Sequence, residues 1–165
     1  MRGGRNAEGF PDPTATIAVG NVTREEREMR INWYDPKNDP VKYIKQVQAE
    51  KRITRKEAEK IVRKWVPKEG DFQAKIKEAI KERYPQALVV KIAQGEYSQA
   101  GIPDLMAIID GHFFGFEVKR PYFNKKSELQ KKTVKWIREA GGTADFISYR
   151  EEALDIIEAY FKTGR

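Results

Sequence analysis

The sequence predicts an α/β fold in which a central mixed sheet is flanked by helices and preceded by an N-terminal helical extension. After Pro67, segments of helical periodicity alternate with short apolar segments in the order α-β-β-β-α-β-α. Asp110-Gly111 stands between two of the apolar segments and is a strong signal for a tight hairpin. The chain has 165 residues, of which 39% are hydrophobic, so it is long enough to bury a core.

Two parts are expected before this core. Residues 1–20 contain four glycines and a Pro-Asp-Pro segment, which predicts a poorly ordered, flexible arm. Residues 21–66 are expected to be helical, because they carry the capping-box pairs Thr23/Glu26 and Thr54/Glu57 and the helix start Asp39-Pro40. Two short helices could form a helix-turn-helix DNA reader or a packing or dimerisation appendage. We favour the second interpretation.

Residues 67–165 are predicted to form the α/β domain. Its expected elements are a helix over 70–84, a strand over 87–93, strands from Leu105 and from His112, a helix over 127–140, a strand over 143–149 and a helix over 151–162. Spacing on the helix over 127–140 predicts a buried stripe of Leu129, Thr133, Trp136, Ile137 and Ala140.

The hairpin turn fixes which residues of its two strands face each other. If Asp110 and Gly111 are the two loop residues, Ile109 pairs with His112, and counting outward sets Asp104 opposite Glu117. Their Cβ atoms should then lie roughly 4.5 to 5.5 Å apart. Like charges at that distance need a shared proton, a basic neighbour or a bound cation. Lys119 lies on the same strand face as Glu117.

This cluster has two interpretations. It is either a surface ion pair at a strand end or a metal site, and two carboxylates would suit Mg²⁺ or Mn²⁺ rather than zinc. Glu69 and Gln130 are further candidates from the neighbouring helices. Each also has a structural explanation, because Glu69 suits a helix N-terminus and Gln130 forms a capping box with Ser127.

Composition limits the chemistry that is available. The chain has no cysteine and one histidine, His112, so carboxylates and lysines must carry any catalysis. The net charge is +7, which favours a polyanionic partner. Eight basic residues and one acid lie between residues 119 and 138, and a solvated helix face is the plain alternative to a DNA-binding surface. The candidates for DNA contact are Lys119, Arg120, Lys125, Lys126, Lys131, Lys132, Lys135 and Arg138.

Five short motifs together carry a resemblance to a known family. They are Gly101-Ile102-Pro103-Asp104-Leu105, Glu117-Val118-Lys119, Gln130, Gly141-Gly142 and the loop Gly95-Glu96-Tyr97. Over about residues 68 to 150 the chain resembles the virus-type replication-repair nuclease (VRR-NUC) branch of the PD-(D/E)XK superfamily, including its small phage members. The resemblance implies a restriction-endonuclease-like core and says nothing of residues 1–66.

The resemblance also implies roles for individual residues. Asp104, Glu117 and the backbone carbonyl of Val118 would bind Mg²⁺ or Mn²⁺, Glu69 would match the family's helix carboxylate, and Gln130 would match its supporting glutamine. Lys119 would orient the attacking water. The implied activity is hydrolysis of DNA phosphodiester bonds by a structure-selective endonuclease that cuts branched DNA, such as four-way junctions, in phage-type replication, recombination or repair.

The remaining expectations concern partners and location. Small members of this branch resemble junction resolvases, which implies a homodimer. The alternatives are a catalytically inactive DNA-binding subunit and an adaptor whose residues 21–66 dock a replication or packaging partner. No apolar run approaches the roughly 18 to 20 residues that span a bilayer, so we expect no membrane contact and a cytoplasmic protein, in the host cytoplasm if phage-encoded.

Overall fold

The computed structural model describes residues 31–92 and 102–163. Every element given below belongs to the unit Trp33–Arg165. The predicted arm, the Thr23/Glu26 capping box and the Gly95-Glu96-Tyr97 loop lie outside the described residues. No helix in the described ranges is both long and apolar enough to cross a membrane.

Two short helices precede the sheet. Helix α2 spans Pro40–Lys51 and is capped by Asp39, whose carboxylate accepts a hydrogen bond from the Val41 N–H. Helix α3 spans Arg55–Trp65, and the predicted capping box between Thr54 and Glu57 is present. The two helices pack against each other through apolar residues, of which Ile44, Val47, Ala58 and Val62 are buried.

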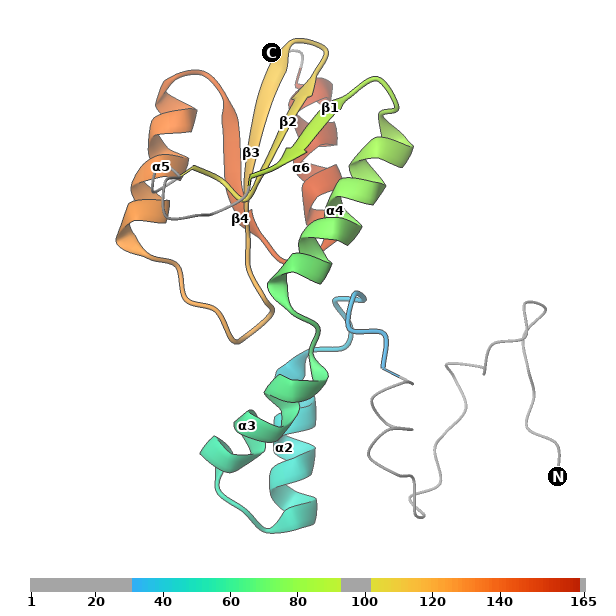
Figure 1. The fold of residues 1–165 in the computed structure, drawn as a ribbon, viewed down its shortest axis with the longest axis vertical. Helices are drawn as coiled ribbons and strands as arrows, with labels where there is room; N and C mark the ends of the chain where they lie inside the picture. The colour runs from blue at the N-terminus through green and yellow to red at the C-terminus, as the bar shows by residue number, and fades with distance from the viewer. Residues whose placement is uncertain (1–30, 93–101, 164–165) are drawn as a thin grey trace, which may run out of the picture. The chain divides into compact units, whose positions relative to one another are not determined.

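The α/β domain has the predicted order of elements (Figure 1). The elements are α4 (Glu69–Arg83), β1 (Leu88–Lys91), β2 (Leu105–Ile109), β3 (His112–Val118), α5 (Glu128–Glu139), β4 (Thr143–Ile147) and α6 (Arg150–Lys162). The sheet order is β1-β2-β3-β4, with β4 parallel to β3 and the other neighbours antiparallel. The predicted α/β class and mixed sheet are therefore confirmed.

The hairpin register also follows the prediction. Asp110 and Gly111 have φ values of 47° and 80°, as a two-residue turn with two left-handed positions requires. Ile109 pairs with His112 and Leu105 with Phe116. Asp104 therefore reaches the position opposite Glu117, one residue beyond the paired part of β2.

Helices cover the two faces of the sheet unequally. Figure 1 shows α4 and α6 on one side of the sheet and α5 on the other. The rings of Phe114 and Phe161 lie 6.1 Å apart on the α4–α6 side. On the other side α5 contacts β3 and β4, with Ile137 lying against Gly115. Beyond α5, Leu88 and Ile108 remain 58% and 44% exposed.

The predicted buried stripe of α5 is wrong in part. Val134 is the buried residue of the helix, whereas Leu129 and Trp136 are 41% and 59% exposed and Ala140 is exposed. The physical reason is that periodicity identifies an apolar face, whereas the contacts of α5 with β3 and β4 leave part of that face uncovered.

Candidate active site

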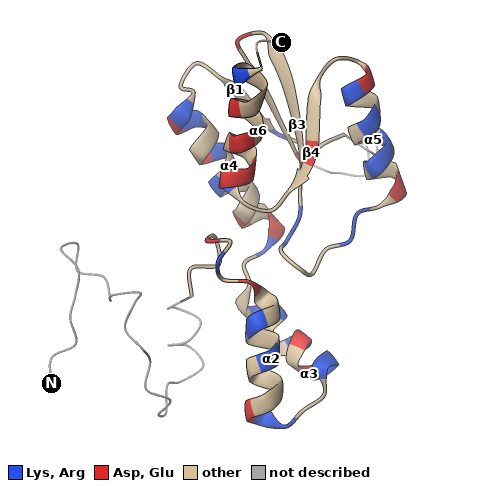
Figure 2. Cartoon of the chain, turned by 180° about the vertical axis from the view of Figure 1, so that it is seen from behind, with Lys and Arg blue, Asp and Glu red and all other residues tan. Residues whose placement is uncertain are grey.

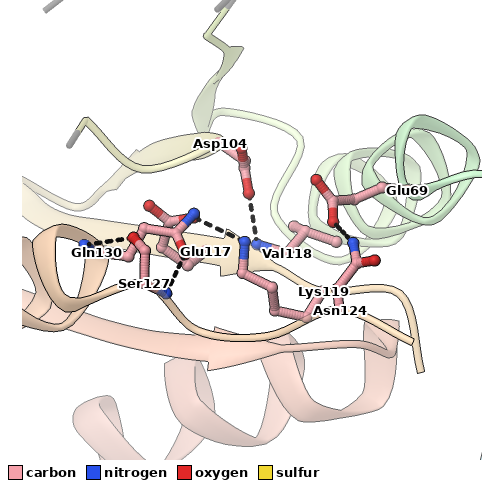
Figure 3. A network of polar contacts seen from close by, with 8 residues as sticks. All are labelled: Glu69, Asp104, Glu117, Val118, Lys119, Asn124, Ser127 and Gln130. Atoms are coloured by element: carbon pink, nitrogen blue, oxygen red, sulfur yellow. Dashed lines mark hydrogen bonds and ion pairs between the residues drawn. The ribbon is translucent and has the colours of Figure 1, made fainter. Parts of the chain in front are cut away.

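Glu117 lies at the centre of the site. It is fully buried on β3, on the sheet face that α5 covers. One carboxylate oxygen, Oε2, accepts a hydrogen bond from Gln130 Nε2 at 3.0 Å and lies 3.5 Å from Lys119 Nζ (Figure 3). The other oxygen, Oε1, is buried and has no hydrogen-bond partner within the described ranges. A buried carboxylate oxygen without a donor is costly, so this atom calls for an explanation.

Asp104 comes from the chain segment that enters β2 and is 4% exposed. Its Oδ2 accepts a hydrogen bond of 2.9 Å from the backbone N–H of Val118 (Figure 3). The hairpin thus ties the first carboxylate to the backbone of the strand that carries the second, one residue past Glu117. Val118, the residue between Glu117 and Lys119, therefore contributes its backbone N–H to the site.

The two carboxylates influence each other electrostatically. Burial is the main cause, and together with the charge of Asp104 and a hydrogen bond with Asp104 it raises the pKa of Glu117 from its ordinary 4.5 to about 7. The Lys119 ammonium acts in the opposite sense. These two acids therefore lie close enough to compete for one proton, as the register predicted.

Gln130 makes hydrogen bonds that fit both of its candidate interpretations. Its Oε1 accepts a hydrogen bond from the Ser127 N–H, and its own N–H donates to Ser127 Oγ, which completes the capping box of α5. Its Nε2 is left free to donate to Glu117. The start of α5 is thereby attached to the buried carboxylate, and the capping and site interpretations are compatible.

Glu69 lies in the first turn of α4 and is hydrogen-bonded to a residue outside the Asp104–Glu117 pair. Its Oε2 accepts a hydrogen bond from Asn124 Nδ2 (Figure 3). Within the ranges that the structure describes, no group of three or more His, Cys, Asp or Glu side chains is placed to hold a metal ion. The structure therefore does not bring Glu69 into one metal-binding cluster with Asp104 and Glu117, and its role as a ligand stays a prediction.

Sequence reasoning did not identify Asn124. It lies in the segment between β3 and α5, where no periodic pattern indicates which way a side chain points. A polar residue a few positions after the Glu117-Val118-Lys119 motif was the only available signal. That signal is weak, because polar residues are common in such segments.

The basic residues predicted to contact DNA occupy three environments. Lys119 is buried beside Glu117. The Arg120 guanidinium donates to the carbonyl oxygens of Arg63 and Val66, and to that of Pro67 at 2.7 Å. Burial lowers the pKa of Arg120. The remaining six are exposed, on α5 or the segment before it (Figure 2). These six are Lys125, Lys126, Lys131, Lys132, Lys135 and Arg138.

A pocket of about 620 Å³ lies among these exposed residues. Four cations line it, together with Val134 and Phe146, and the Lys126 Nζ lies 4.5 Å from the centroid of the Phe146 ring. Three of the cations are partly neutralised, since Lys131, Lys135 and Arg138 form ion pairs with Glu128, Glu139 and Asp145. Contact with DNA here remains a prediction.

Comparisons with known proteins found a similarity among solved structures. Neither the protein-family models nor the curated proteins contain a match to this chain. Among solved structures, the chain is similar to one described as a "VRR_NUC domain", at 24% sequence identity and a TM-score of 0.43. That alignment covers 53% of this chain and 95% of the other chain.

Proposed function

We propose that this protein is a divalent-metal-dependent nuclease whose active site is formed by Asp104, Glu117 and Lys119. The observation that carries the proposal is the state of Glu117. It is a fully buried carboxylate with one oxygen that lacks a donor, beside a second buried carboxylate and one ammonium group. A fold tolerates that arrangement when a cation or a proton neutralises the excess negative charge.

The donor set suits a hard cation. The Asp104 and Glu117 carboxylates, together with the Val118 carbonyl, would offer Mg²⁺ or Mn²⁺ oxygen ligands, which both ions prefer. When bound, such an ion lowers the pKa of a coordinated water and stabilises negative charge on a phosphate. Gln130 and Lys119 both interact with the same Glu117 oxygen, which leaves the other oxygen available.

The protein's own side chains supply orientation and charge. The hydrogen bond from the Val118 N–H fixes Asp104, and the Gln130 amide fixes Glu117. Lys119 presents an ammonium group beside these acids and is suited to hold an anionic phosphate oxygen and the water that attacks it. No histidine base is needed, because the attacking water would already have a lowered pKa when a divalent ion is bound.

The finer assignment rests on the sequence motifs. They support DNA as the substrate, a branched form such as a four-way junction as the preferred shape, and a homodimer as the active unit. A catalytically inactive DNA-binding or adaptor subunit predicts binding without turnover, so one experiment distinguishes the two functions.

That experiment is a cleavage panel. Purified protein is incubated with labelled four-way junction, flap, linear duplex and RNA substrates, in EDTA, Mg²⁺ or Mn²⁺. We expect cleavage only with metal, and faster cleavage of the junction. Glu117→Gln and Asp104→Asn should each lower the rate by at least about a thousandfold, the order expected when a group that organises electrostatic stabilisation is lost.

The matched control is Asp155→Asn, which removes an exposed carboxylate from α6 and should leave the rate unchanged. Cleavage that persists in both Glu117→Gln and Asp104→Asn would disprove the site. Metal-independent binding with no cleavage of any substrate would favour the inactive-subunit alternative.

A further inference from the structure

Helix α3 carries a row of lysines that the active site does not use. Lys56, Lys60 and Lys64 recur every four residues, so their side chains lie along one face over about 12 Å. All three are exposed. None forms an ion pair with any residue in the ranges 31–92 and 102–163. We call these three residues the α3 lysine row.

The opposite face of α3 is already buried. Ala58 and Val62 are fully buried, and the helix packs on α2. The Thr54–Glu57 capping box satisfies the helix start. The lysine row is therefore not required to fold α3. Glu57 offsets part of the charge of Lys60, but three ammonium groups on one face still repel each other, which destabilises an isolated helix slightly and favours an anionic partner.

The segment that follows the catalytic lysine holds α3. Arg120, the residue directly after Lys119, donates to the carbonyl oxygens of Arg63 and Val66 at the end of α3. At the start of α3, the Tyr122 hydroxyl accepts a hydrogen bond from Arg55 and donates one of 2.5 Å to Glu59. Both ends of α3 are therefore attached to residues 120–122, so the helix is connected directly to the active-site strand.

We propose that the α3 lysine row binds the phosphate backbone of the nucleic-acid substrate outside the active site. This inference rests on the proposed function, because it takes the substrate to be a nucleic acid. It assigns the row backbone contacts that are independent of base sequence, since lysine binds phosphate as a flexible point charge. It differs from a helix-turn-helix reader, which would place base-contacting side chains in a groove.

A nucleic acid fits the row better than a membrane. A helix that lies on a lipid surface inserts an apolar face beside its basic one. The apolar face of α3 is buried against α2, and the exposed row contains no aromatic or aliphatic residue. A regular line of ammonium groups without an apolar partner matches a phosphate backbone, whose charges also repeat at short intervals.

The test measures binding in EDTA, so that it does not depend on catalysis. The triple variant Lys56→Gln, Lys60→Gln, Lys64→Gln is compared with wild type by fluorescence anisotropy on a labelled four-way junction and a 30-base-pair duplex over a range of salt concentrations. We expect at least tenfold weaker binding near 0.1 M salt, and a slope of log K against log salt that is shallower by about 0.9 for each lysine that contacts phosphate.

Two further variants serve as controls. Lys75→Gln, Lys77→Gln, Lys162→Gln removes the same formal charge from exposed positions on α4 and α6 and should change the slope much less. Lys56→Arg, Lys60→Arg, Lys64→Arg keeps the charge and should keep the wild-type slope. Thermal unfolding of all three variants checks that the fold is retained, which the exposure of these lysines favours.

Each outcome has a defined meaning. If the α3 variant loses no more affinity than the α4–α6 variant, or keeps the wild-type slope, the inference is wrong. If nucleic-acid binding is unchanged while binding to vesicles containing anionic phosphatidylserine is lost, the row serves a membrane and the inference is also wrong. If the row affects binding but no metal supports cleavage, the inference stands and the nuclease proposal fails.

Discussion

Glu117 shows how a single residue can combine a structural cost with a functional use. The side chain is buried among apolar strands, faces a second carboxylate and has one oxygen without a donor. Its polar neighbours, Gln130 and Lys119, both interact with the other oxygen. Burial, followed by the charge of the nearby Asp104, raises the pKa of Glu117 to about 7, so in the absence of a cation a proton can neutralise this site.

The raised pKa gives the first prediction, on stability without metal. Because the pKa of Glu117 is higher in the folded protein than its ordinary 4.5, the folded state holds the proton more tightly, and stability falls as pH rises from about 4.5 through about 7. Above pH 7 the cost is about 3 kcal/mol. Glu117→Gln cannot ionise, so in EDTA its free energy of unfolding should exceed that of wild type by a margin that grows over this pH range. Urea unfolding at pH 5, 6, 7 and 8 measures the margin.

Metal provides the second half of this test. Adding Mn²⁺ at pH 8 should stabilise the wild-type protein, since an ion that binds only the folded state raises its stability. The same addition should leave Glu117→Gln almost unchanged. A margin that does not vary with pH, or equal stabilisation of both proteins by Mn²⁺, would contradict this account of Glu117.

The start of α5 shows how one element supports the site. Gln130 completes the capping box with Ser127 and also donates to Glu117, so helix stability and carboxylate orientation depend on the same side chain. A capping box needs only the side-chain carbonyl oxygen of Gln130. The amide nitrogen remains for the site, which a glutamate in the same place could not supply.

Two substitutions separate these roles. Ser127→Ala removes the cap and should cost about 1 kcal/mol of stability while leaving Mn²⁺ affinity near wild type. Gln130→Glu keeps the capping box but replaces the donor to Glu117 with a third negative charge, so it should change Mn²⁺ affinity, reduce cleavage and lower the stability of the metal-free protein. Chemical unfolding and calorimetric titration of Mn²⁺ measure the two effects. Equal changes in affinity for both variants would show that Gln130 acts only as a cap.

Arg120 is the second case in which an element depends on a single side chain. The sequence placed this residue among the DNA contacts, whereas its guanidinium donates to carbonyl oxygens of Arg63, Val66 and Pro67 at the end of α3. Cations at a helix C-terminus also interact favourably with its dipole. The arginine is therefore already occupied by three acceptors.

Replacement of Arg120 should thus affect stability more than binding. Arg120→Met keeps the aliphatic stem and removes the donors, so we expect a loss of about 2 to 3 kcal/mol from the unsatisfied carbonyl groups. The slope of DNA binding against salt should stay within experimental error of wild type. A shallower slope with unchanged stability would indicate that Arg120 contacts DNA.

The elements differ in how far the sequence could predict them. The hairpin was predictable in detail, because Asp110-Gly111 permits one tight turn and every pairing follows from it. The proximity of Asp104 and Glu117 was predictable for the same reason. The burial of Trp136 was predicted wrongly, since periodicity identifies an apolar face but not how much of the sheet lies beneath it.

Contacts between distant segments were the other limit. The hydrogen bond between Glu69 and Asn124 and the anchoring of α3 by Arg120 join residues more than 50 positions apart. Neither belongs to a repeating pattern, so no periodic or turn signal predicts it. The sequence therefore showed that Arg120 is basic but not that helix carbonyls already satisfy its donors.

Across the molecule, positive charge is not distributed evenly. Lys and Arg outnumber Asp and Glu on α5, whereas the two signs balance on α4 and acidic residues outnumber basic ones on α6 (Figure 2). The net charge of the chain is +7, and residues 119–138 contribute an equal excess. A polyanion would therefore be attracted to one side of the α/β domain, the side on which α5 contacts Glu117.

The charge of α5 gives the last prediction, at the scale of the whole molecule. Lys131 and Lys135 form ion pairs with Glu128 and Glu139 of the same helix, whereas Lys125 and Lys132 have no ion-pair partner within the described residues. Lys131→Ala with Lys135→Ala should weaken DNA binding and flatten its salt dependence without altering Mn²⁺ affinity, because neither residue contacts Asp104 or Glu117.

Lys125→Ala with Lys132→Ala should have the larger effect, since DNA need not displace a carboxylate to reach these ammonium groups. Anisotropy titrations at several salt concentrations compare the two pairs. Unchanged slopes in both would remove α5 from the DNA footprint, and a larger effect of the paired lysines would show that their carboxylates do not compete with phosphate.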